Sequence, residues 1–259
     1  MKVERRVVDS ARGIVQLTLS DERWYIISKE NKPDRYMPST TWICSYYPKG
    51  VGYMRWFAEH GYDEAEAIKI AAGEKGSRVH KAISDILLGN TVKITDKYSA
   101  DGEEPKELTA IEYEAIMSFV NWLHKTQPEI LAVDYTLVNE EENYAGTIDM
   151  KVKINGEIWI IDIKTSKDIY PSHELQVSAY KQADKEVEKI AILQVGYARN
   201  KDKFKFTEIE DQYGLFKSAQ NIWAKETAGQ QPSQKDFPLE LVWKKIPTGS
   251  KELPRITKK

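Results

Sequence analysis

Residues 148–163 contain the pattern that most restricts what this chain can fold into. Residues typical of β-strands alternate with polar ones over 148–154, the pair Asn155-Gly156 follows, and a second β-type run covers 158–163. Asn-Gly between two such runs is the strongest short hairpin signal, because both residues tolerate the positive φ angles of a type I′ turn. We therefore predict a β-hairpin with a two-residue turn.

The register of this hairpin brings two carboxylates together. If the turn holds only two residues, Ile154 faces Glu157, and counting outward sets Asp149 directly opposite Asp162. Side chains in directly opposed positions have Cβ atoms only about 5 Å apart, and like charges at that distance repel. Lys164 shares a face with Asp162, because side chains alternate along a strand. A β-bulge would shift this register by one residue.

Two aspartates and a lysine on one side of a hairpin suit the chemistry of a divalent cation. Carboxylates at this separation make a good site for a hard ion such as Mg²⁺, whose charge removes the repulsion between Asp149 and Asp162. An ammonium beside the ion, here that of Lys164, can orient or deprotonate water or steady a developing negative charge. The residues alone thus predict a cation site with a lysine next to it.

Three short motifs around the hairpin occur in a fixed order, namely GTID at 146–149, IIDIKTS at 160–166 and QVSAY at 176–180. They resemble the Gly-x-x-Asp, Asp-x-Lys and Gln-x-x-x-Tyr motifs of the PD-(D/E)XK nuclease superfamily, and most closely those of its RecB-like exonuclease branch. Order and spacing match together, which is more specific than Asp-x-Lys alone. The resemblance implies an α/β fold with a restriction-endonuclease-like core, in which helices flank a central mixed β-sheet. It also implies that Gln176 and Tyr180, one helical turn apart, support the site or touch the substrate backbone.

A histidine upstream of the hairpin has two interpretations. In the helix predicted at 75–88, Gly76, His80, Ile83 and Leu87 share one face. From the residues alone, a lone inward histidine is most simply part of the core. However, residues 76–87 (GSRVHKAISDIL) resemble the helical motif of RecB-like nucleases, in which the histidine is a metal ligand. With the downstream motifs present, we favour the interpretation of His80 as a ligand.

The same resemblance implies three further site residues. YMPSTT at 36–41 resembles a Pro-Ser-x-Thr element of phage-type RecB-like exonucleases and of the mitochondrial genome maintenance exonuclease, and by that comparison Ser39 and Thr41 contact a nucleic-acid phosphate. A plain helix N-cap explains these hydroxyls equally well. Asp134 stands where relatives often have an acidic residue, which places it among the metal ligands or behind them. A surface acid is an equally good account of Asp134.

Composition limits the remaining possibilities. The 259 residues are 41% hydrophobic and 30% charged, as in ordinary soluble globular proteins. The single cysteine, Cys44, rules out an intramolecular disulfide and the four-cysteine iron–sulfur cluster of some RecB-like relatives. No apolar run approaches the roughly 20 residues of a membrane helix, and the first residues lack a signal-peptide pattern. We expect a cytoplasmic protein of a prokaryote or of a phage-infected host cell, without membrane contact.

The net charge of −2 provides no global field that attracts a polyanion, so a nucleic-acid enzyme of this composition must concentrate its cations locally. Residues 243–259 do so, although a solvated chain end is the simpler interpretation. Their cations, set against Glu252 alone, are Lys244, Lys245, Lys251, Arg255, Lys258 and Lys259.

The chain is predicted to have three parts: an N-terminal β meander at 1–35, a nuclease core with a helical N-terminal part at 36–229, and a basic C-terminal extension at 230–259. In the core, Gly73 is expected to separate one helix at 64–72 from the next at 75–88, and the polar residues 91–107 are expected to be a loop. Further helices are predicted at 109–125, 173–185 and 211–226, and further strands at 130–139, 189–197 and 203–209.

These features and the resemblance together imply a Mg²⁺- or Mn²⁺-dependent deoxyribonuclease, an exonuclease acting on DNA ends or single strands. By that comparison His80, Asp149, Asp162 and the carbonyl of Ile163 hold the metal, and Lys164 positions or activates the attacking water. Two alternatives stay open, a structure-specific endonuclease with the same site and a non-catalytic DNA-binding recombination protein on a nuclease scaffold. Self-association and a recombination partner protein are equally open.

Overall fold

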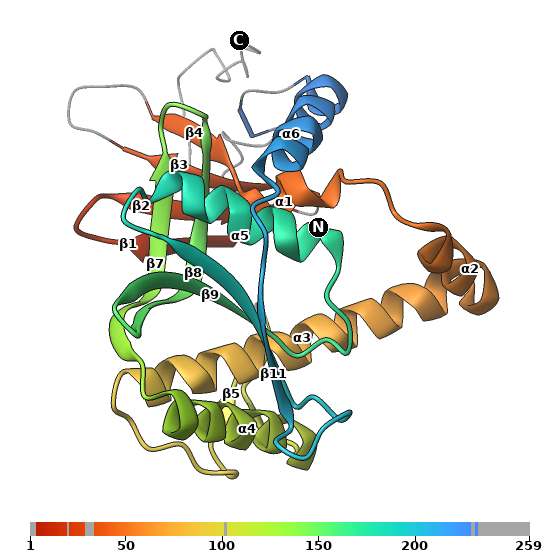
Figure 1. Ribbon diagram of the computed structural model, residues 1–259. Helices are drawn as coiled ribbons and strands as arrows, with labels where there is room; N and C mark the ends of the chain where they lie inside the picture. The colour runs from red at the N-terminus through yellow and green to blue at the C-terminus, as the bar shows by residue number, and fades with distance from the viewer. Residues whose placement is uncertain (1–3, 20, 29–33, 101–102, 229–230, 233–259) are drawn as a thin grey trace, which may run out of the picture.

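The protein is described by a computed structural model over residues 4–19, 21–28, 34–100, 103–228 and 231–232. Two larger β-sheets, a small two-stranded sheet and several helices make up the described part of the chain, and a long helix crosses below the strands (Figure 1). The predicted C-terminal extension lies outside the described residues, except for 231 and 232. In the described part of the chain, no helix combines the length and the apolar character needed to cross a membrane.

The N-terminal β meander forms a sheet of four strands. Its antiparallel strands lie in the order β1 (Glu4–Asp9), β2 (Ile14–Thr18), β3 (Arg23–Ile27) and β4 (Arg35–Pro38). The fourth strand spans position 35, where we expected the meander to end. A parallel bridge between Ser39 and Ala145 follows directly, so this sheet leads into the central one rather than standing apart from it.

The helical part of the chain begins with α1 (Thr40–Ser45) and α2 (Val51–His60), which precede the long helix α3 (Tyr62–Leu87). The predicted break at Gly73 is wrong, because α3 passes through this position without interruption. A glycine in a helix costs only about 1 kcal/mol relative to alanine. The helix continues through an exposed stretch at 67–73 between its buried residues, which are Ala65 on one side and Val79, Ala82 and Ile83 on the other.

The predicted loop at 91–107 contains a small sheet of two short strands, β5 (Lys97–Tyr98) and β6 (Lys106–Glu107). This differs from our expectation because contacts with α3 hold the segment in place. Tyr98 donates a hydrogen bond to Asp85 (2.8 Å), and the ammonium of Lys81 donates one to the carbonyl of Ser99 (2.8 Å). Helix α4 (Ala110–Thr126) follows, as predicted.

The central sheet has the strand order β11-β10-β9-β8-β7, in which β9 and β10 are parallel and the other neighbours antiparallel. Helices α3 and α4 cover one face and α5 the other, which confirms the predicted α/β class with helices flanking a mixed sheet. The elements are β7 (Glu129–Asn139), β8 (Tyr144–Ile154), β9 (Glu157–Lys164), α5 (Pro171–Ala183), β10 (Lys189–Val195), β11 (Phe204–Glu208) and α6 (Tyr213–Thr227).

The hairpin of β8 and β9 is confirmed. Ile154 pairs with Glu157, and the turn residues Asn155 and Gly156 have φ angles of 51° and 92°. The pairing continues in step as far as Met150 and Ile161, with no bulge between. Asp149 and Asp162 are the next residues beyond this last pair. In the predicted register they would face each other, and they lie where the ladder of hydrogen bonds ends.

Candidate active site

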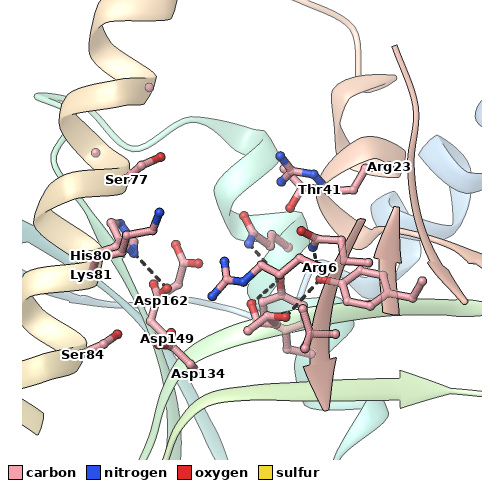
Figure 2. A pocket seen from close by; sticks show the side chains of 18 of the residues that line it. Arg6, Arg23, Thr41, Ser77, His80, Lys81, Ser84, Asp134, Asp149 and Asp162 are labelled. Atoms are coloured by element: carbon pink, nitrogen blue, oxygen red, sulfur yellow. Dashed lines mark hydrogen bonds and ion pairs between the residues drawn. The ribbon is translucent and has the colours of Figure 1, made fainter. Parts of the chain in front are cut away.

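A hollow of about 560 Å³ lies among helix α3, the N-terminal sheet and the strands that carry the hairpin aspartates (Figure 2). It brings together most of the residues singled out in the sequence. Those that line it are Thr41, His80, Asp134, Asp149, Asp162, Lys164, Gln176 and Tyr180. Ser39 and Ile163 are not among the lining residues.

The acidic floor of the hollow comes from three neighbouring strands. Asp134 of β7 falls between the pairs Val133–Met150 and Tyr135–Ile148, which sets it opposite Asp149 of β8. The φ angle of Asp134 is 47°, a left-handed conformation that aspartate tolerates better than most residues. The regular ladder is interrupted there, and three aspartates, one from each of β7, β8 and β9, line the same hollow.

Both oxygens of Asp149 accept hydrogen bonds. Nδ1 of His80 lies 3.0 Å from Oδ1, and the backbone N–H of Ile163 donates to Oδ2 at 2.6 Å. Desolvation would raise the pKa of Asp149, but the charge and hydrogen bond of His80, together with Lys164 and the N–H of Ile163, hold it below its usual value. Asp149 thus remains an ionised carboxylate beside a histidine.

His80 opens into the hollow instead of closing into the core, because 29% of its side chain is exposed. Val79, Ala82 and Ile83, which lie on the same helix, are packed in the core. Desolvation would lower the pKa of His80, but the charge of Asp149 and the hydrogen bond to it outweigh that effect and raise the pKa. The structure therefore does not support the interpretation of this histidine as a buried core residue.

Asp162 and Lys164 form the second charged contact of the site, with Nζ 2.6 Å from Oδ2. Desolvation, and the nearby charge of Asp149, raise the pKa of Asp162 against the opposing effect of Lys164. The Asp162 side chain is only 4% exposed, and its buried Oδ2 accepts no hydrogen bond of regular geometry from the described residues. The ammonium of Lys164 compensates the charge of this buried oxygen.

Helix α5 supplies a hydrogen-bonded chain behind Lys164. Oε1 of Gln176 lies 3.5 Å from Nζ of Lys164, and Nε2 of Gln176 donates to the hydroxyl of Tyr180 at 2.9 Å. The Tyr180 hydroxyl donates in turn to the carbonyl of Thr147 at 3.2 Å. Gln176 and Tyr180 therefore project together into the site and connect the lysine to strand β8.

The structure separates the two hydroxyls of the predicted phosphate element. Ser39 is buried, and its Oγ accepts a hydrogen bond from the backbone of Trp42 (3.1 Å) as the N-cap of α1. Thr41 is exposed and lines the hollow. The side chain of Ile163 is buried in the core, and its N–H is directed to Asp149. Thr41 is thus in a position to meet a ligand, whereas Ser39 orients the helix that carries it.

The donor chemistry of the floor fits a divalent cation, although a complete ligand set is not assembled. Among the described residues, no three His, Cys, Asp or Glu side chains are grouped so that they could hold a metal ion. Instead His80 contacts Asp149, and Lys164 contacts Asp162. Two carboxylates and an imidazole are suitable donors for Mg²⁺ or Mn²⁺.

The part of the hollow that the sequence did not indicate comes from the N-terminal sheet. Arg6, Arg23, Gln16 and Tyr25 line it, with Nε2 of Gln16 donating to the hydroxyl of Tyr25 at 2.9 Å. That hydroxyl lies 3.1 Å from Oγ1 of Thr147, next to the site. Arg6 and Arg23 belong to two different strands, β1 and β3, and only the packing of two sheets directs them to the aspartates.

No protein-family model and no curated protein match the sequence. Among solved structures, the crystal structure of an alkaline exonuclease (LHK-Exo) from Laribacter hongkongensis is similar, with 11% identity, a TM-score of 0.41 and coverage of 75% of this chain and 87% of that one. The crystal structure of SSO0001 has 17% identity, a TM-score of 0.30 and coverage of 47% and 61%, respectively. At this level of likeness, function has to be argued from the residues of the site.

Proposed function

We propose that this protein is a metal-dependent deoxyribonuclease, an exonuclease that hydrolyses phosphodiester bonds at DNA ends or in single strands. The observation that carries the proposal is the set of Asp149, Asp162 and Lys164 in one hollow at the end of the hairpin ladder. The three sequence motifs of PD-(D/E)XK type support it, because all their ionisable residues are present and line this hollow.

In this proposal each side chain has a separate task. Asp149 and Asp162 would hold Mg²⁺ or Mn²⁺, with His80 and the carbonyl of Ile163 as further ligands and Asp134 beside them. An ion held there would supply Lewis-acid polarisation of the scissile phosphate and charge stabilisation.

Lys164 acts next to that ion. Its Nζ positions the attacking water or hydrogen-bonds a phosphate oxygen as negative charge develops there. Gln176 and Tyr180 restrict the position of this ammonium through the chain of hydrogen bonds from Lys164 to Thr147. Thr41 is available at the wall of the hollow for a substrate phosphate.

The test is digestion of end-labelled linear DNA and of circular DNA, single- and double-stranded, with Mg²⁺, Mn²⁺ or EDTA. We expect linear DNA to be shortened only when a metal ion is present, and circles to stay intact. Asp162→Ala and Lys164→Ala should each abolish cleavage, because each removes a group that contacts the ion or the reacting phosphate. Both variants should keep the far-ultraviolet circular dichroism of the wild type.

Lys167→Ala is the matched control, because Lys167 is an exposed lysine three positions beyond Lys164 and does not line the hollow. It should digest DNA at the wild-type rate. Retained cleavage in Asp162→Ala or Lys164→Ala would refute the proposal, and so would cleavage in EDTA. Nicked circles would identify an endonuclease instead, and DNA binding without cleavage would identify a non-catalytic protein.

A further inference from the structure

The wall of the hollow opposite α3 carries two arginines of the N-terminal sheet. Arg6 of β1 is directly opposite Gln16 of β2, which is directly opposite Tyr25 of β3. Arg23 lies two residues before Tyr25 and therefore on the same face of the sheet. In Figure 2, Arg6 stands across the hollow from His80, with Asp149 and Asp162 between them. One face of this small sheet thus presents a row of polar side chains to the acidic floor.

The positive charges of Arg6 and Arg23 have no ion-pair partner within the described part of the protein. Among the described residues, neither guanidinium forms an ion pair or a side-chain hydrogen bond. Burial raises the pKa of Asp134, and the charge of Arg6 opposes that rise. By contrast, Lys81 on the α3 side donates to a backbone carbonyl, and Lys164 contacts Asp162. The guanidinium groups at this wall are therefore available to an anionic ligand.

The chemistry of the wall favours phosphate as that ligand. A guanidinium presents several N–H donors in a planar fork that matches phosphate oxygens, and such charge-assisted bonds are stronger than neutral ones. The hydroxyl of Thr41 lines the same hollow and adds a further donor. A phosphodiester backbone bound here would lie against the wall while one of its linkages faced Asp149 and Asp162.

The size of the hollow limits how much nucleic acid it holds. A volume of about 560 Å³ is within the range of small-molecule sites, which suits one or two nucleotides of a single strand. Helix α3 bounds the hollow on one side and the N-terminal sheet on the other (Figure 2). We therefore expect a single strand to reach the aspartates more readily than a duplex.

We propose that Arg6 and Arg23 bind backbone phosphates of a single DNA strand and so select single-stranded over duplex substrate at this site. This inference rests on the proposed function for the cleavage step, but the binding that it predicts does not depend on cleavage. Because phosphate contacts carry no sequence information, binding should be the same for strands of different base sequence.

The experiment measures binding of a fluorescent single-stranded oligonucleotide and of the matching duplex by anisotropy, in EDTA, over a range of salt concentrations. The wild type should bind the single strand more tightly than the duplex. Arg6→Ala and Arg23→Ala should each weaken single-strand binding about tenfold, since each loses a charge-assisted contact. Each should also reduce the slope of log K against log salt by about 0.7, the value for one phosphate of a single strand.

Arg5→Ala is the matched control, because Arg5 is the neighbouring exposed arginine on β1, faces the other side of the sheet and does not line the hollow. Its affinity and salt slope should stay close to those of the wild type. The inference is overturned if Arg5→Ala weakens binding as much as Arg6→Ala, or if neither Arg6→Ala nor Arg23→Ala changes it. Equal affinity for duplex, or no binding by the wild type, overturns it as well.

These outcomes are separate from those of the digestion test. A wild type that cleaves DNA while Arg6→Ala and Arg23→Ala bind normally would leave the proposed nuclease in place and remove the role of the arginines. A wild type that binds single strands through both arginines but does not cleave with Mg²⁺ or Mn²⁺ would do the reverse. The unfolding midpoint of each variant should match that of the wild type, because their side chains are not part of the core.

Discussion

Tyr180 reaches the backbone of Thr147 because residue 146 has no side chain. A Cβ on Gly146 would lie 2.5 Å from Cε1 of Tyr180 and 2.9 Å from Oγ1 of Thr40, which is closer than real Cβ contacts. Thr40 and Tyr180 are both fully buried, so neither ring nor hydroxyl can move away into solvent. The absence of a side chain at the glycine of the GTID motif therefore has a steric explanation, because α1 and α5 approach β8 closely at this position.

Gly146→Ala is expected to lower the free energy of unfolding by about 1–3 kcal/mol, because the added methyl group overpacks a closed part of the core. Urea denaturation of the variant and the wild type measures the difference. Gly214→Ala serves as the control, since a Cβ at that position of α6 would meet nothing within 4 Å. An unfolding midpoint for Gly146→Ala equal to that of the wild type would contradict the packing described here.

At the scale of elements, Glu112 joins the start of α4 to the middle of α3. Its Oε2 accepts a hydrogen bond from the backbone of Thr109 (2.8 Å) in a capping box, and its Oε1 lies 2.8 Å from Nε of Arg78. Desolvation would raise the pKa of Glu112, but the hydrogen bonds from Thr109 and the charge of Arg78 lower it below the ordinary value of 4.5. The side chain is only 1% exposed, so solvent screens this contact little.

The lowered pKa gives stability a defined dependence on pH. Because the folded state binds the proton of Glu112 less readily than the unfolded state, its contribution is complete above about pH 4.5 and is lost as pH falls through the lower, folded pKa. Glu112→Gln should be less stable at neutral pH and lose less stability on acidification. Urea unfolding at a series of pH values between about 3 and 7 measures both effects.

Glu114→Gln is the control for this prediction, because Glu114 lies on the same helix with a half-exposed side chain and pairs with Lys203 at 3.5 Å. Its stability should follow that of the wild type over the whole range. If Glu112→Gln lost as much stability on acidification as the wild type, the contact with Arg78 and Thr109 would not be the source of the acid dependence.

For the whole molecule, the N-terminal sheet shares its core with the central part of the chain. Trp24 of β3 packs edge to face against Trp42 of α1 and Trp223 of α6, with ring centroids 5.2 and 5.9 Å apart. On the other face of the sheet, Tyr25 and Met37 are buried in a cluster with Ala145 of β8. The sheet that contributes Arg6 and Arg23 is thus held to the central part of the chain by buried apolar surface on both faces.

A chain that begins at residue 34 is therefore expected to lose cooperative unfolding, because removing β1 to β3 exposes the clusters around Trp42, Trp223 and Ala145. Circular dichroism during heating and binding of a hydrophobic dye at low temperature measure the loss. A truncated chain that unfolds in one sharp transition at the wild-type temperature, without added dye binding, would show that the sheet is an independent appendage.

Local patterns were sufficient for the elements whose stability comes from neighbouring residues. The Asn155-Gly156 turn and the pairing from Ile154 and Glu157 outward follow from turn chemistry and the two-residue period of strands. The local patterns failed at Gly73, because a single glycine costs a helix only about 1 kcal/mol and α3 continues through it. The segment 91–107 was also misassigned as loop alone, because its order depends on contacts with α3 that no local pattern records.

The sequence by itself determined which side chains are available for chemistry, since the motif spacing and strand register place Asp149, Asp162 and Lys164 at one end of a hairpin. Only the tertiary structure decided that His80 opens toward them, that Ser39 caps a helix, and that Arg6 and Arg23 form the opposite wall. The reason is physical. The register of paired strands is set by hydrogen bonds between neighbours in the same sheet. The wall that the distant N-terminal sheet contributes to the hollow is set by how two apolar faces pack.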